Sequence, residues 1–418
     1  MNPDEAASVF VDPRSYADDA RFQAATALLR RESPVHWVES SNLAPFWAIT
    51  RHEDVMAISR NSEIWRNAPR TAVNQDPAAD APPVRTLVQM DAPDHPVYRH
   101  ISAPWFTPAG VRRLSDRVAE LAKRYVDHMA ELGGSCDFFT DVASHYPLYV
   151  ILSLLGLPED DFPRMLKLTQ ELFGAEDPDF ARAADDDAAL AALLDFFQYF
   201  QGIIADRRKN PTDDLASVIA NATLETGEIG EMEAVGYYVL IATAGHDTTS
   251  AAISGGLHAL LRNPDQLRRL TDDPSLVGTA VEEMVRWVSP VKHFMRTANR
   301  DTSVHGVDIK EGQAVLLSYP SANRDEEVFD QADTFDVGRT PNKHVGFGFG
   351  AHYCLGTHLA RLEGRALYSE LIPRLRSIEL DGTPEYTDTL FVGGPKRLPI
   401  RYELGESMTA LTGDQVSG

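Results

Sequence analysis

The segment that most restricts the fold is residues 234–261, AVGYYVLIATAGHDTTSAAISGGLHALL, because it holds a single formally charged side chain, Asp247. A helix that is apolar on nearly all sides must be buried, in a membrane or in a large protein core. The segment is long enough to span a bilayer. However, it is rich in glycine, serine and threonine and has an acid at its centre. We therefore expect a long helix enclosed in protein, and no membrane partner.

The composition agrees with a large protein core. Hydrophobic residues make up 43% and charged residues 24% of the 418 residues, which are ordinary values for a globular chain. The 39 basic and 62 acidic residues give a net charge of −23, which argues against nucleic acid or anionic lipid as a partner. The beginning, MNPDEAASVF, does not resemble a secretion signal, and there are only two cysteines. These features predict a cytoplasmic protein with free thiols.

The rest of the chain predicts a mainly α fold with a small β region near both ends. We expect one domain over residues 1–404 and a flexible tail over residues 405–418. Alternating apolar residues predict two strands and a hairpin, at residues 33–40, 45–51 and 303–318 (turned at 310–312). Apolar residues at spacings of three and four predict helices at residues 109–132, 186–209, 278–288 and 355–371.

A glycine-rich loop, FGFGAHYCLG, runs from Phe347 to Gly356 and contains Cys354 just before a predicted helix. Thiolates are stabilised at helix N-termini, where unpaired N–H groups point outward. The glycines allow tight turns and a close approach to a large, flat partner. The loop therefore predicts a thiolate directed at a ligand or a metal.

Three other interpretations of this loop are possible from the residues alone. A buried core cysteine would not need so many neighbouring glycines. A zinc site could use His352, Cys354 and His358, but four ligands are expected and no second cysteine pair is near. A phosphate-binding loop is disfavoured because the glycines follow G-x-G-x-G and no clear βαβ unit surrounds them.

The loop resembles the haem-binding loop of the cytochrome P450 family, F-G-x-G-x-H-x-C-x-G, at every fixed position. The resemblance implies a cytochrome P450 fold, with haem b between a long distal helix and the cysteine loop with its helix. It also implies that Cys354 is the axial ligand of the haem iron. Phe347, His352 and Gly356 would then belong to the haem-binding loop.

Asp247 lies in the sequence AGHDTT, in the middle of the long apolar segment. A buried carboxylate is costly unless it is paired or used, and the residues alone also allow a capped or kinked helix with a structural acid. The motif resembles the A-G-x-(D/E)-T of the same family. The resemblance implies that Gly245 makes room for dioxygen and that Asp247 and Thr248 are the catalytic pair that delivers protons.

Buried haem propionates need cationic or hydrogen-bonding partners. Considered singly, each candidate is an ordinary surface residue. Their positions resemble those of the family, and the resemblance implies contacts to haem from His95, Arg99, Arg296 and His344.

Glu283 and Arg286 are three residues apart on a predicted helix, a spacing that alone indicates only an exposed ion pair. They resemble the family's E-x-x-R pair, which a later arginine joins. The resemblance implies a structural triad of Glu283, Arg286 and Arg339.

The C-terminal third is most similar to the terpineol-hydroxylating bacterial branch of the family. This implies hydroxylation of a C–H bond in a small hydrophobic substrate, of the monoterpene or alkyl-aromatic class, with O₂. The substrate pocket is expected to be apolar and to include Phe173, Ile241, Ala244, Val291, Phe294, Leu390, Phe391 and Val392. A larger steroid-like or polycyclic substrate stays open, as does a haem-binding sensor or carrier without turnover.

No reductase domain is attached, so the resemblance implies separate electron donors: a ferredoxin and its NAD(P)H-dependent reductase. Because the chain is acidic, docking of an acidic ferredoxin would need a local basic patch. Basic residues expected near the cysteine loop are Arg99, Arg112, Arg113, Lys343 and Arg361. Scattered, solvated charges are the alternative.

Overall fold

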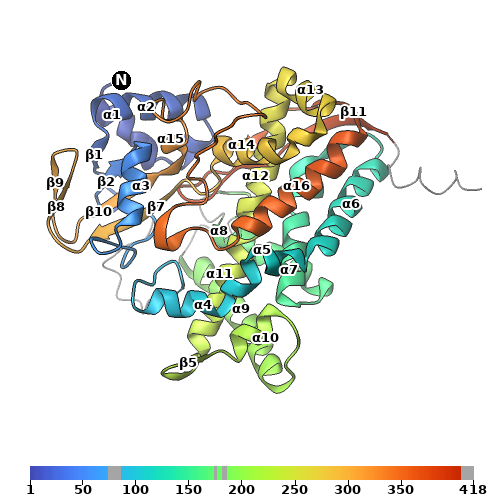
Figure 1. Cartoon of the computed structure of the whole chain (residues 1–418), viewed down its shortest axis with the longest axis horizontal. Coiled ribbons are helices and arrows are strands. Elements are labelled where there is room, and N and C mark those ends of the chain that lie inside the picture. Colours follow the sequence, from blue (N-terminus) through green and yellow to red (C-terminus); the bar gives the residue numbers. More distant parts are fainter. Residues whose placement is uncertain (74–85, 174–176, 181–185, 406–418) are drawn as a thin grey trace, which may run out of the picture.

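The computed structural model describes residues 1–73, 86–173, 177–180 and 186–405, with helices as its main component (Figure 1). The helices are α1 (Pro3–Ala7), α2 (Asp19–Glu32), α3 (His52–Arg60), α4 (Asp94–Phe106), α5 (Pro108–Arg112), α6 (Ser115–Glu131), α7 (Tyr146–Leu155), α8 (Phe162–Phe173), α9 (Asp186–Lys209), α10 (Leu215–Ala220), α11 (Glu231–Ala244), α12 (Asp247–Arg262), α13 (Pro264–Asp272), α14 (Val277–Val288), α15 (Tyr319–Ala322) and α16 (Thr357–Arg374). The predicted tail, apart from Gly405, lies outside the described residues.

A five-stranded sheet lies beside α1–α3, on the left in Figure 1. Its order is β1 (Val35–Val38), β2 (Phe46–Ile49), β10 (Ala314–Ser318), β7 (His293–Ala298) and β3 (Trp65–Arg66). The first two strands pair antiparallel, as the sequence predicts. β7 matters for the site, because Phe294 and Arg296 are two residues apart and therefore point to the same face of the sheet.

The other strands form small sheets. They are β4 (Ser135–Asp137), β5 (Thr223–Leu224), β6 (Gly227–Glu228), β8 (Thr302–Val304), β9 (Val307–Ile309), β11 (Leu375–Leu380), β12 (Glu385–Tyr386), β13 (Pro395–Arg397) and β14 (Pro399–Leu404). β11, β14 and β4 form a three-stranded sheet.

The predicted hairpin over residues 303–318 is wrong in its pairing. β8 pairs with β9 through a turn at His305 and Gly306, whose φ angles are 49° and 73°. The chain turns again near residue 312, but β10 then enters the central sheet between β2 and β7. Alternation alone could not distinguish these pairings, because β10 is buried along its whole length.

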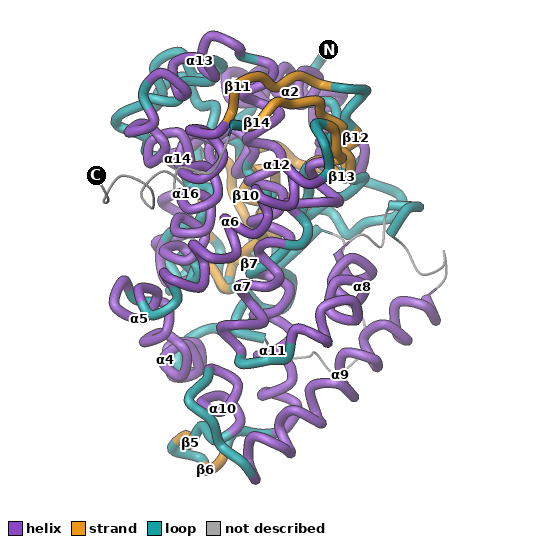
Figure 2. The backbone as a smooth tube through the Cα atoms, turned by 90° about the vertical axis from the view of Figure 1, so that its right-hand side faces the viewer, coloured by secondary structure: helices purple, strands orange, loops and turns teal. Residues whose placement is uncertain are grey.

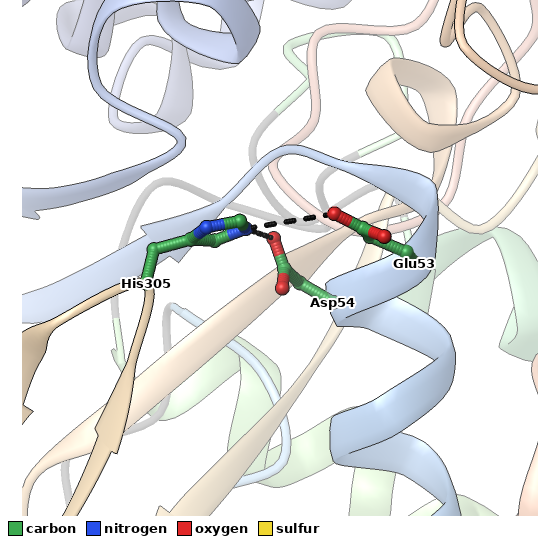
Figure 3. Close-up of side chains that lie close together, drawn as sticks. All are labelled: Glu53, Asp54 and His305. Atoms are coloured by element: carbon green, nitrogen blue, oxygen red, sulfur yellow. Dashed lines mark hydrogen bonds and ion pairs between the residues drawn. The ribbon is translucent and has the colours of Figure 1, made fainter.

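The tip of the β8–β9 hairpin is fastened to α3 by His305 (Figure 3). Its Nε2 lies 2.8 Å from Asp54 Oδ2 and 3.8 Å from Glu53 Oε1. Both acids belong to the first turn of α3, where negative charge is favourable. The contact is an ion pair between two surface elements.

The helices α6, α7, α14 and α16 pack around α12 and one another (Figure 2). As predicted from its composition, α12 is mostly buried. Among the described residues, none of the helices is both long and apolar enough to cross a bilayer. The helix predicted over residues 109–132 is two helices, α5 and α6. A Cβ on Gly110 would lie 2.4 Å from Pro104 O, so packing against the end of α4 sets the direction of α5.

Candidate active site

The long apolar segment contains a helix break at Gly245 and His246, where a single helix was predicted. α11 ends at Ala244 and α12 begins at Asp247, and Thr248 Oγ1 donates a hydrogen bond to Ala244 O at 2.8 Å across the break. A Cβ on Gly245 would lie 2.3 Å from Ile151 Cδ1 of α7. Close packing of α7 therefore requires glycine at the break, a contact that periodicity in one segment cannot reveal.

A cavity of about 250 Å³ lies between this break and the cysteine loop. Its lining is mainly apolar side chains from α7, α11, α12, α14, β7 and α16. It brings together most of the residues predicted for the site, from far apart in the sequence: His95, Arg99, Ile241, Ala244, Gly245, Thr248, Val291, Phe294, Arg296, Phe347, His352, Cys354 and Gly356.

Cys354 is exposed to this cavity. Its N–H donates to Phe347 O at 2.9 Å, which closes the loop, and Gly350 within it has a φ of 76°. A Cβ on Gly350 would lie 2.1 Å from Ser59 O, so no other residue fits there. Burial raises the pKa of the Cys354 thiol, whereas the N–H of Gly356 opposes that shift.

The polar residues of the cavity suit a flat group with carboxylates. Arg296 is only 4% exposed, and Nη1 donates to Met295 O at 2.7 Å. No carboxylate among the described residues forms an ion pair with it, and a buried cation without a partner is costly. The ring centroids of His95 and His352 lie 3.9 Å apart. Burial lowers the pKa of both rings, that of His352 to about 2. The residues present therefore fit haem and its propionates.

His344, predicted as a fourth propionate partner, does not line the cavity. Its Nε2 lies 3.2 Å from Glu282 Oε2, and its Nδ1 accepts a hydrogen bond from Gly346 N at 3.2 Å. Arg361 donates two hydrogen bonds to the same Glu282 carboxylate, at 2.6 and 2.7 Å. Both ring nitrogens of His344 are therefore occupied on the far side of the loop.

Four predicted pocket residues also fall elsewhere. Leu390 packs in the core under the sheet, and Val392 pairs with Val291 and lines a separate, smaller cavity. The ring centroids of Phe391 and Phe294 lie 5.3 Å apart, and of the two only Phe294 lines the cavity. The side chain of Phe173 lies outside the described part of the chain.

Glu283, Arg286 and Arg339 meet in the protein interior. Arg286 forms two hydrogen bonds of 2.7 Å to the Glu283 carboxylate, and both residues are fully buried. Arg339 Nε lies 3.1 Å from Glu283 Oε2. Arg286 also donates to three backbone carbonyls, of Asn323, Ala332 and Thr334. The ion pair is thus a buried, fully bonded junction rather than a surface pair.

Glu363 of α16 is a cavity residue that the sequence analysis missed. Its carboxyl is buried, and neither oxygen has a hydrogen-bond partner among the described residues. Burial raises its pKa well above the ordinary value, whereas Thr249 opposes that shift. The signal was present in the sequence, since Glu363 follows Leu359 by four residues and so lies on the apolar face of its helix.

The zinc alternative does not hold. Among the described residues, the three ligand atoms found within 4.8 Å of one another belong to Glu53, Asp54 and His305, not to His352, Cys354 and His358. His352 instead stacks on His95 inside the cavity.

Comparisons with known proteins agree with this geometry. The model of the family "Cytochrome P450" matches residues 45–397. The chain is 44% identical to cytochrome P450-terp of a Pseudomonas species, over 96% of this chain and 98% of that one. It is 34% identical to a steroid C26-monooxygenase of Mycolicibacterium smegmatis, over 90% of this chain and 89% of that one. The structure of CYP108D1 from Novosphingobium aromaticivorans superposes with a TM-score of 0.88 at 38% identity, covering 97% of this chain and all of that one. The chain therefore belongs to the cytochrome P450 family, and it is a monooxygenase with haem b as its cofactor.

Proposed function

We propose that this protein hydroxylates a C–H bond of a small hydrophobic molecule of the monoterpene or alkyl-aromatic class. One observation carries the proposal: Cys354 and Thr248 line the same mainly apolar cavity. In the overall reaction a C–H bond, O₂, two electrons and two protons give a C–OH group and water. Bound haem b supplies the iron at which O₂ is activated.

Haem would be held by Cys354 as thiolate ligand and by Arg99 and Arg296 at the propionates. His95 and His352 are neutral at pH 7, because burial lowers their pKa values, and so serve as hydrogen-bond donors. Tyr353, which precedes the ligand, accepts a hydrogen bond of 2.6 Å from Arg99 through its carbonyl. Arg99 therefore also links α4 to the cysteine loop.

Thr248 is the proton donor at the cavity, and Asp247 supplies it. A closed apolar site contains few protons, so a positioned acid and alcohol are needed to deliver them. Thr248 can act there because its hydroxyl, now bonded to Ala244 O, faces the cavity. Burial raises the pKa of the Glu363 carboxyl in the same wall, which favours its protonated form.

The cavity walls support a compact apolar substrate. Leu240, Ile241, Val291 and Phe294 line it, and the charged groups there are those assigned to haem or to Glu363. The similarity to cytochrome P450-terp favours a monoterpene. The similarity to a steroid C26-monooxygenase keeps a larger, steroid-like substrate as the second candidate.

Electrons would come from a ferredoxin and its NAD(P)H-dependent reductase in the cytoplasm. Arg112, Arg113 and Lys343 are exposed and suit an acidic partner. Arg361 is less available than predicted, because the Glu282 carboxylate already pairs with it.

The test begins with reduction of the purified protein and addition of carbon monoxide. A strongly red-shifted Soret band is expected from thiolate ligation. A panel containing α-terpineol, p-cymene and a steroid is then scored by the spin state of the ferric haem and by products. Hydroxylated monoterpene is the expected result. No O₂ consumption with any compound would favour a haem sensor or carrier, and turnover of the steroid alone would overturn the substrate class.

A further inference from the structure

His246 occupies the helix break beside Asp247, and its imidazole is 1% exposed. Nε2 lies 2.7 Å from Ser144 O, a carbonyl that can only accept. Nδ1 lies 3.3 Å from Asp247 Oδ1 and 3.2 Å from Thr169 Oγ1. The Thr169 hydroxyl donates its own hydrogen to Leu166 O at 3.0 Å. Ser144 O can only accept, the Thr169 hydroxyl already uses its hydrogen, and an ionised Asp247 would accept as well, so a doubly protonated imidazole satisfies all three neighbours.

Asp247 divides its two oxygens between different surroundings. Oδ1 faces His246, whereas Oδ2 is buried and has no hydrogen-bond partner in the part of the chain that the structure describes. The residue lines a second cavity of about 40 Å³, together with Gln170, Thr387 and Val392. Space of about 10–15 Å³ suffices for one water molecule where polar partners exist, so this cavity can hold water. Thr248 lines the other, larger cavity instead.

The other described charged groups near His246 and Asp247 do not take the place of His246 as the partner of Asp247. His145 of the neighbouring turn is partly buried, and burial lowers its pKa, as does the charge of His246. Asp141 accepts a hydrogen bond from Asp137 N at 3.0 Å. On β13, Lys396 is paired with Asp177 and Asp179, and on α16, Glu363 faces Thr249. Among the described residues, His246 is thus the cation within ion-pair distance of Asp247.

We propose that His246 is a positioning residue for proton delivery: it holds one oxygen of Asp247 and leaves the other open to the second cavity, where protons enter. Asp247 then takes a proton from water in that cavity and passes it on towards Thr248, so that the carboxyl returns to its starting state after each transfer. This inference rests on the proposed function, since it concerns the same relay.

Nitrogen-15 NMR of histidine-labelled protein tests the charge without a substrate. In the diamagnetic ferrous carbon monoxide form, the resonances lost in His246→Gln identify this ring among 13 histidines. An imidazolium at pH 7 is expected, with its titration midpoint lowered by about one pH unit or more in Asp247→Asn. A neutral ring at pH 7, or a midpoint that Asp247→Asn does not move, would overturn the inference.

The amount of product formed per NAD(P)H consumed, called coupling, tests the role of His246 in proton delivery. With α-terpineol as probe, His246→Gln is expected to keep the carbon monoxide band but to lose about tenfold in product per NAD(P)H, as for one lost charge-assisted hydrogen bond. The double variant with Asp247→Asn should lose no more than Asp247→Asn alone, because the two residues act together. His145→Gln, the same change in a partly buried histidine next to Ser144, is the control and should keep the product yield per NAD(P)H of the parent.

The outcomes separate the two proposals. Coupling in His246→Gln equal to that of the parent from pH 5.5 to 8.5 would overturn the role of His246 and leave the proposed function standing. A parent protein without product from the substrate panel would overturn the proposed function, whereas the NMR titration would still decide the state of His246. If His246→Gln takes up no haem, Thr169→Val is measured in its place, with a smaller loss of coupling expected and unchanged coupling as the overturning result.

Discussion

Asp247 and Thr248 are adjacent in the chain but line different cavities. Thr248 lines the larger cavity, which Cys354 also lines, and Asp247 lines the smaller one. Consecutive side chains on a helix do not face the same way, so the first two residues of α12 can reach separate cavities. A relay through both residues would therefore connect two chambers that the helix otherwise keeps apart.

Thr248→Ala is expected to bind haem normally but to consume NAD(P)H without product and to release peroxide. Coupling should fall at least about tenfold, since a positioned proton donor contributes 10²–10⁴-fold. The matched control is Thr243→Ala. That threonine makes the same hydrogen bond to the carbonyl four residues earlier, at 2.7 Å, but it does not line the cavity. Tight coupling in Thr248→Ala would exclude the hydroxyl from the relay.

Cys354→Ser should abolish the red-shifted carbon monoxide band while leaving the fold intact, because a serine hydroxyl does not ionise to a comparable ligand. Absorption spectra of the reduced protein check this. Cys136→Ser changes the only other cysteine, in β4, and should leave the band unchanged. A persisting band in Cys354→Ser would mean that another residue holds the iron.

Arg296→Gln should lower haem affinity by at least about tenfold, the cost of losing one charge-assisted interaction in a buried site. Transfer of haem to an acceptor protein measures this change in haem affinity. His344→Gln is the comparison, because Glu282 and Gly346 already engage both of its ring nitrogens and His344 does not line the cavity. Equal losses in the two variants would restore His344 as a propionate partner.

Gly245→Ala should destabilise the protein by about 1–3 kcal/mol, because the new Cβ would overlap Ile151. Ile151→Ala should cost about 2–5 kcal/mol by leaving a cavity. The double variant should cost less than the sum, since the methyl group then occupies vacated space. Thermal unfolding of the haem-loaded proteins measures the free energies of unfolding that make up this double-mutant cycle. Strict additivity would show that Gly245 serves something other than the packing of α7.

Glu363→Gln should make stability less dependent on pH. Burial raises the pKa of Glu363 in the folded protein, whereas the carboxyl ionises near pH 4.3 when the chain is unfolded. Its contribution to folding is therefore complete below about pH 4.3 and is lost as the pH rises towards the raised pKa, by up to about 1.4 kcal/mol per pH unit. The Tm of Glu363→Gln should gain on that of the parent as the pH rises above about 4.3. Glu379→Gln, at an exposed position, should leave the pH dependence of the Tm as it is in the parent.

Local features of the sequence determined the cofactor loop and the general fold. A cysteine at a helix start among glycines is a constraint within ten residues, and Gly350 adopts the positive φ that such a loop needs. The burial of α12 follows from its composition, and the helix spacing of Glu283 and Arg286 already brought them to one face. These features depend on neighbours in the chain, so they can be predicted from it.

Only the tertiary structure decided where side chains from distant elements point. Glu282 and Gly346 engage both ring nitrogens of His344, and Ile151 of α7 leaves no room for a side chain at Gly245. Asp247 and Thr248 line different cavities because of the elements that pack on each side of α12. These outcomes depend mainly on contacts between segments that are far apart in the chain. Periodicity and motif spacing carry no record of such contacts, because they describe one element at a time.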